Sequence, residues 1–106
     1  MTNTISITDV RGMFARYERA NESAGLIPDG FHLVLSEGSK YYGNAYRVHL
    51  TGNRVKLDNG RYEWPNGTGH DNPPVGNDFL GMTKRDAYDS LADAARIIED
   101  MTRANA

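Results

Sequence analysis

Apolar and polar residues alternate along residues 44–64, NAYRVHLTGNRVKLDNGRYEW. Gly52-Asn53 and Asn59-Gly60 divide this stretch, and both residue types tolerate the positive φ that two-residue hairpin loops require. With turns there, Val48 faces Leu57 and Lys56 faces Glu63, and both registers sort the residues in the same way. The pattern predicts a three-stranded antiparallel ribbon. Its apolar face carries Tyr46, Val48, Leu50, Val55, Leu57, Tyr62 and Trp64, and its polar face carries Arg47, His49, Arg54, Lys56, Asp58, Arg61 and Glu63.

A helical pattern precedes the ribbon. Ser6 or Thr8 can cap a helix that starts near Asp9, and Ser6 with Asp9 forms a capping box. Apolar residues then recur at helical spacing, at Val10, Met13, Phe14, Tyr17, Ala20 and Ala24. Residues 31–35 (FHLVL) read as a strand with alternating faces. We therefore expect one helix and a first strand before the ribbon begins.

After the ribbon, residues 65–78 (PNGTGHDNPPVGND) show no periodicity and predict a long irregular loop. Residues 79–82 return the chain to the core as a short strand. Thr83 then caps a second helix with Asp86 at its third position. The apolar stripe of this helix is Tyr88, Leu91, Ala94, Ala95, Ile98 and Met101.

The order of elements predicts an α+β fold, a two-layer sandwich in which an antiparallel meander of three to four strands packs against an N-terminal and a C-terminal helix. The other face of the sheet is expected to be in water. The 106 residues make a single domain, 1–106, with frayed ends at 1–5 and 103–106.

Composition narrows the classes of function. The formal net charge of −2 does not favour a strongly basic nucleic-acid binder, and the chain has no cysteine. No apolar run approaches the roughly 18 residues of a membrane span, and the start of the chain predicts no signal peptide. The histidines follow no metal-binding spacing and are expected at the surface. No catalytic residue, metal site or cofactor is predicted, and an enzyme is not expected.

Basic residues on the polar face suggest one binding hypothesis. Exposed basic side chains can neutralise phosphates of a nucleic acid. However, the aromatic residues of the ribbon point to the opposite face, and acidic residues interrupt the basic ones, which favours a solvated surface with cross-strand ion pairs. The candidate nucleic-acid contacts are Arg47, Arg54, Lys56, Arg61, Lys84 and Arg85.

The irregular loop suggests a second hypothesis, a protein-binding surface. Aromatic and rigid apolar residues cluster in and beside it, and such residues are frequent anchors at interfaces. The alternative is that Trp64 and Phe79 only cap the core. The candidate partner-binding residues are Trp64, Pro65, His70, Pro74, Val75 and Phe79.

Residues 81–88, GMTKRDAY, resemble a segment of small uncharacterised actinobacteriophage proteins, in which a Gly-x-Thr turn opens a C-terminal helix. The resemblance covers mainly the last quarter of the chain. It implies a phage accessory protein, made in the cytoplasm of a bacterial host, that binds a host protein. No catalytic residue is carried over from it.

Two fold-level resemblances are weaker. The helix–strands–helix order resembles double-stranded RNA-binding domains, but Lys84-Arg85-Asp86-Ala87-Tyr88 lacks the final lysine of their last helix. The sheet and following helix loosely resemble AP2-type DNA-binding domains, whose exposed sheet tryptophan is missing here. The sequence thus predicts a non-enzymatic interaction protein, with nucleic-acid binding as the alternative and pairing of two copies through a sheet edge as a further expectation.

Overall fold

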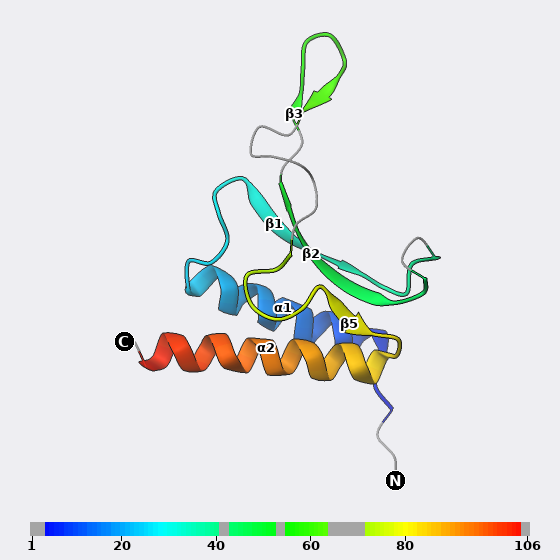
Figure 1. Cartoon of the computed structure of the whole chain (residues 1–106), viewed down its shortest axis with the longest axis vertical. Coiled ribbons are helices and arrows are strands. Elements are labelled where there is room, and N and C mark those ends of the chain that lie inside the picture. Colours follow the sequence, from blue (N-terminus) through cyan, green and yellow to red (C-terminus); the bar gives the residue numbers. More distant parts are fainter. Residues whose placement is uncertain (1–3, 41–42, 53–54, 64–71, 105–106) are drawn as a thin grey trace.

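The computed structural model describes residues 4–40, 43–52, 55–63 and 72–104. Along these residues the chain forms α1 (Ile7–Ser23), β1 (Phe31–Ser36), β2 (Tyr46–Gly52), β3 (Val55–Lys56), β4 (Tyr62–Glu63), β5 (Phe79–Gly81) and α2 (Lys84–Ala104). Figure 1 shows the two helices side by side beneath an antiparallel sheet, while β3 lies in a hairpin that projects away from them. The predicted α+β class, with helices before and after an antiparallel meander, is confirmed.

The N-terminal helix begins where its capping chemistry predicts. Ser6 is the N-cap: its hydroxyl accepts a hydrogen bond from the Asp9 backbone N–H at 3.1 Å, and the Asp9 carboxylate accepts one from the Ser6 N–H at 2.9 Å. This capping box satisfies two of the N–H groups that a helix leaves unpaired at its start. The predicted apolar stripe faces the core, with Val10 and Tyr17 almost fully buried.

The C-terminal helix also starts as predicted, because the Thr83 hydroxyl accepts a hydrogen bond from the Asp86 N–H at 3.0 Å. It includes Arg103 and Ala104, which the sequence assigns to a frayed end. Its stripe is buried as far as Ile98, but Met101 is 48% exposed, so its predicted place in the core is wrong. At about 100° per residue, Met101 lies nearer in direction to exposed Ile97 than to Ile98.

The sheet next to the helices has the strand order β1-β2-β5, and all its pairs are antiparallel. Val48 of β2 lies opposite Leu35 of β1, and its N–H donates to the Asp78 carbonyl on the other side at 2.8 Å. The predicted pairing of Val48 with Leu57 is therefore wrong. A pairing between segments 30 residues apart in sequence displaced the local one, which periodicity alone cannot reveal.

The hairpin of β3 and β4 forms a separate two-stranded sheet. Lys56 is paired with Tyr62, one position away from the predicted pairing with Glu63. The reason lies in the loop: Leu57 N–H donates to the Arg61 carbonyl at 2.7 Å, so the loop has three residues, and Gly60 closes it with φ 84°. The other predicted turn, Gly52-Asn53, includes a residue outside those described.

The core joins both helices to the sheet. Leu33, Val48 and Leu50 from the strands pack with buried residues of α1 and α2. On the opposite face, His49 and Thr51 are only 8% and 7% exposed. The predictions of a fully solvated polar face and of surface histidines are wrong at these positions. Both residues lie beside β1, His49 opposite Val34 and Thr51 opposite His32.

The connection from β5 to α2 depends on Gly81. Its φ of 134° is unfavourable for any residue with a side chain. A Cβ built here would overlap Asp86 Cβ and lie 3.2 Å from Asp86 Oδ2. The tight turn therefore places Thr83 and Asp86 directly against the end of the last strand.

Candidate functional site

A cavity of about 240 Å³ opens between the segment that leads into β5 and the outer side of α2. Its floor is apolar, because Val48, Leu80 and Leu91 of the core reach it. Its rim includes Phe79 and Ile97, which are 45% and 48% exposed. The remaining lining residues are Tyr17, Val75, Gly76, Asn77, Ser90, Asp93 and Ala94.

Tyr17 anchors the wall of this cavity to α1. Its hydroxyl donates a hydrogen bond of 2.6 Å to the Val75 carbonyl, 58 residues later in the chain. Burial raises the pKa of the Tyr17 hydroxyl to about 12, and the hydrogen bond with Asn21 opposes this shift. The phenol is therefore neutral at ordinary pH and keeps its proton for the Val75 carbonyl, which satisfies a backbone acceptor beside the core.

Arg47 fixes the next part of the same wall. Its guanidinium donates to the Asp78 carboxylate at 3.0 Å and lies 5.4 Å from the centre of the Phe79 ring. An arginine over an aromatic face restrains the ring through cation–π attraction. Together with the backbone bond from Val48 to Asp78, these contacts hold Phe79 at the rim before any ligand arrives.

The opposite rim is one turn of α2. Ile97 lies four residues after Asp93, and such spacing puts the two side chains on one helix face. Asp93 pairs with Arg96 at 3.4 Å, and both side chains are about two-thirds exposed. The rim thus offers an apolar contact and an exposed carboxylate next to an apolar floor.

The structure brings two of the predicted partner-binding residues to this cavity, Val75 and Phe79. Pro74 is exposed beside them. Trp64, Pro65 and His70 lie outside the described residues. Sequence reasoning missed Ile97, because it lies next to Ile98 and the helical stripe accounts for only one of the pair. The sequence did contain one indication: Ile97 is a large apolar residue that lies outside the apolar stripe of α2.

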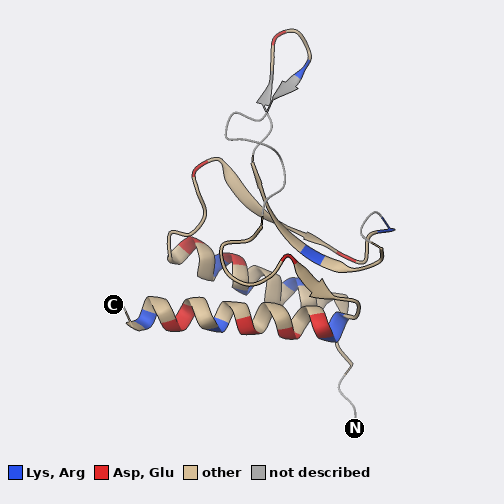
Figure 2. Cartoon of the chain, in the orientation of Figure 1, with Lys and Arg blue, Asp and Glu red and all other residues tan. Residues whose placement is uncertain are grey.

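The predicted nucleic-acid contacts are not gathered on one surface within the described part of the chain. Arg47 is engaged with Asp78 and is only 28% exposed. Arg61 is exposed on the β3–β4 hairpin, while Lys84 and Arg85 are exposed in the first turn of α2, far from the hairpin in Figure 1. Figure 2 shows acidic residues interleaved with the basic ones along α2. Arg54 and the Lys56 side chain lie outside the described part.

Across residues 4–40, 43–52, 55–63 and 72–104, no three His, Cys, Asp or Glu side chains come together as metal ligands would. Within the same ranges, neither helix combines the length and apolarity needed to span a bilayer. The lining of the cavity beside β5 is suited to binding by shape and apolar contact.

Comparison with known proteins adds no relative to this description. No family model, no curated protein and no solved structure matches the chain.

Proposed function

We propose that the protein is a non-enzymatic interaction module that binds another protein through the cavity between Phe79 and Ile97. One observation carries the proposal: two large apolar side chains, each about half exposed, flank an apolar cavity. An exposed isoleucine or phenylalanine alone needs no explanation, but a pair beside a preformed apolar hollow is typical of an anchor pocket.

The size of the cavity limits what it can accept. An apolar cavity of about 150 Å³ is enough to bind benzene. The 240 Å³ available here accommodates one aromatic or branched aliphatic side chain. The ligand is thus the apolar anchor residue of a partner protein, and the rest of the contact is made around the rim.

The charge around the rim favours a basic partner surface. Asp93 lines the cavity, and Asp89 lies one helical turn before it, both exposed on α2. Arg85 and Arg96 lie near these carboxylates at 4.0 and 3.4 Å, but exposed pairs of this kind are weak. A lysine or arginine beside the anchor residue of the partner would add electrostatic steering and select its orientation.

The resemblance of residues 81–88 to actinobacteriophage proteins supports a host protein in a bacterial cytoplasm as this partner. The same segment holds the turn that joins β5 to α2, so it supports both rims of the cavity. In this proposal the phage protein contributes no chemistry and acts by occupying a surface of its target.

The test is affinity capture from an actinobacterial lysate, followed by binding measurements with the purified captured protein. Ile97→Asp should weaken binding at least about tenfold, because it puts a charge on the rim of an anchor pocket. Met101→Asp is the matched control, since Met101 is equally exposed on the same helix and does not line the cavity. It should bind like the wild type.

The results against the proposal are equally specific. Equal loss in both variants would show that the contact lies elsewhere on α2. Failure to capture any protein would remove the basis for a protein partner. A nucleic acid that binds in a salt-dependent manner, and is lost when Lys84 and Arg85 become glutamate, would favour the alternative function instead.

A further inference from the structure

A second cavity, of about 640 Å³, lies between the C-terminal halves of the two helices. Arg16 and Arg19 from α1 lie near Glu99 and Arg103 from α2, so residue numbers rise together and the helices run parallel, as Figure 1 also shows. The lining is completed by Ala20, Ser23 and Thr102. We call this cavity the arginine groove; it is separate from the cavity beside β5.

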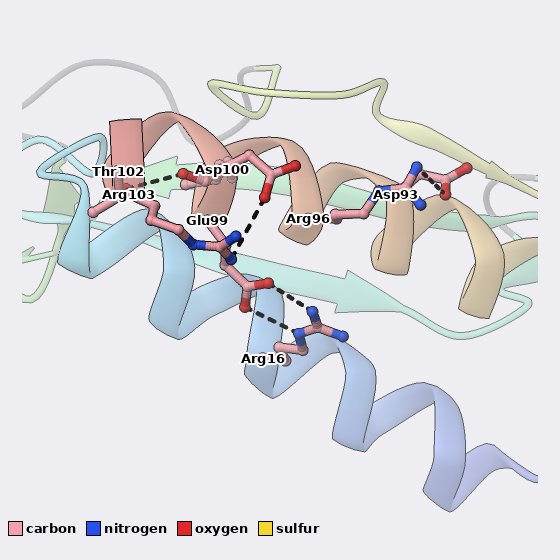
Figure 3. A network of polar contacts seen from close by, with 8 residues as sticks. Arg16, Asp93, Arg96, Glu99, Asp100, Thr102 and Arg103 are labelled. Atoms are coloured by element: carbon pink, nitrogen blue, oxygen red, sulfur yellow. Dashed lines mark hydrogen bonds and ion pairs between the residues drawn. The ribbon is translucent and has the colours of Figure 1, made fainter. Parts of the chain in front are cut away.

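Positive charge exceeds negative charge in the arginine groove. Arg16 donates two hydrogen bonds to the Glu99 carboxylate, from Nε at 3.0 Å and from Nη2 at 2.6 Å (Figure 3). This contact, followed by the charges of Arg103 and Arg19, holds the pKa of the Glu99 carboxyl below its ordinary value. Three guanidinium groups therefore surround one carboxylate, which leaves a net charge of +2 in the lining.

Two features reduce this excess without removing it. Arg103 also approaches Asp100 at 3.6 Å, although both side chains are more than half exposed, where ion pairs are weak. In addition, each helix carries roughly half a negative charge at its C-terminal end. Arg19, in contrast, keeps its positive charge uncompensated: within the described residues its side chain makes no ion pair and no hydrogen bond. One guanidinium on the groove wall is thus available.

The chemistry of the lining indicates a class of ligand. Guanidinium groups match the geometry of phosphate oxygens and remain charged at any ordinary pH. The Thr102 hydroxyl already donates to the Ile98 carbonyl at 2.9 Å, so its oxygen can accept a bond from a ligand hydroxyl, and Ser23 adds a second hydroxyl. Among the residues that the structure describes, no aromatic side chain lines the groove to stack on a base.

We propose that the arginine groove binds a small phosphate monoester that carries hydroxyl groups, of the sugar phosphate class. Arg19 and Arg103 hold the phosphate dianion beside the Arg16–Glu99 pair, while Ser23 and Thr102 contact the hydroxyls. The volume of the groove lies in the range of small-molecule sites, about 300–1,000 Å³.

The test is an NMR titration of the full chain with glucose 6-phosphate, inorganic phosphate and glucose at low salt. A pH of about 8 keeps the phosphate dianionic, since its second pKa is about 6. Saturable shifts should be confined to amides near residues 16–23 and 99–103. Glucose 6-phosphate should bind more tightly than inorganic phosphate, and glucose should not bind. No saturation by glucose 6-phosphate at about 10 mM would overturn the proposal.

Variants separate the groove from general attraction to a basic surface. Arg19→Gln should weaken binding about tenfold, and it breaks no contact within the described residues. Arg96→Gln makes the same replacement on α2 outside the groove, so it is the control and should bind like the wild type. Glu99→Gln should tighten binding, because it removes the competing carboxylate. Equal weakening by Arg19→Gln and Arg96→Gln, or equal affinity for both phosphates, would contradict the assignment.

Discussion

Replacement of Gly81 by alanine should destabilise the fold strongly, because two costs act at once. The backbone at φ 134° disfavours any side chain, at a cost of about 1–3 kcal/mol. The new methyl group would also overlap Asp86 Cβ, which is attached to the main chain of α2 and cannot rotate away. Overpacking of this kind adds about 1–3 kcal/mol.

The sum, about 2–6 kcal/mol, is a large part of the roughly 5–15 kcal/mol that holds a typical domain folded. Urea unfolding followed by circular dichroism should show this loss, and the melting temperature should fall by at least about 8 °C. Gly12→Ala is the matched control. Gly12 lies inside α1 with nothing within 4 Å of a new Cβ, so the same substitution should stabilise by about 0.5–1 kcal/mol.

A double variant separates the two costs. Asp86→Gly removes the overlapping carbon, so the Gly81→Ala/Asp86→Gly pair should be more stable than the sum of the single effects predicts, by about 1 kcal/mol or more. The backbone cost should remain. If Gly81→Ala unfolds within about 0.5 kcal/mol of the wild type, the tight turn described here is wrong.

The remaining predictions concern contacts described above. Tyr17→Phe should cost about 1–3 kcal/mol in urea unfolding, because the Val75 carbonyl loses its donor at the edge of the core. Since the pKa of Tyr17 is raised from 10.0 to about 12, the folded state holds this proton more tightly; stability should fall between pH 10 and 12, and Tyr17→Phe should flatten that fall. The pKa of Glu99 is lowered, mainly by Arg16, so its contribution to stability is present above the ordinary value of 4.5 and is lost as pH falls below it. A carbon-detected NMR titration should find that this carboxyl is protonated only at lower pH, and Arg16→Gln should move its pKa back towards the ordinary value. Ser6→Ala should cost about 1 kcal/mol, while Thr8→Ala, next to it but not the cap, should cost less than half of that.

Local chemistry made the helices predictable from sequence. Ser6 with Asp9 and Thr83 with Asp86 each place a polar side chain three residues from its partner, so the start of a helix is decided within one turn. The apolar stripes were predictable for the same reason, because helical periodicity is a property of neighbouring residues. Met101 shows where this prediction fails. It belongs to the apolar stripe of α2 but is exposed, because tertiary packing decides how far along the helix the stripe is buried.

The pairing of strands depended on information that the pattern does not hold. The loops of two and three residues around Asn59-Gly60 differ by one position, and that difference changes every pair in the hairpin. The pairing of β5 with β2 joins segments that are far apart in sequence. His49 is buried, although alternation alone predicts that it is exposed.

The candidate site was predictable in part for the same reasons. Phe79 stands out because it follows an irregular, proline-containing segment, and loops of this kind often carry function. Ile97 lies on the opposite rim, and the fold alone brings these two residues to one cavity. In the sequence, Tyr17 is an ordinary member of a helical apolar stripe. Only the fold brings the Val75 carbonyl within hydrogen-bonding distance of its hydroxyl.

The parallel packing of α1 against α2 has a consequence during synthesis on the ribosome. The two helices are joined by contacts such as Arg16 with Glu99, 83 residues apart in sequence. At about 5–20 residues per second, the 60 residues between the helices take about 3–12 s to make. Throughout that time the apolar side of α1 has no helix to cover it. Nascent chains of this protein should therefore be bound by a ribosome-associated chaperone until translation ends.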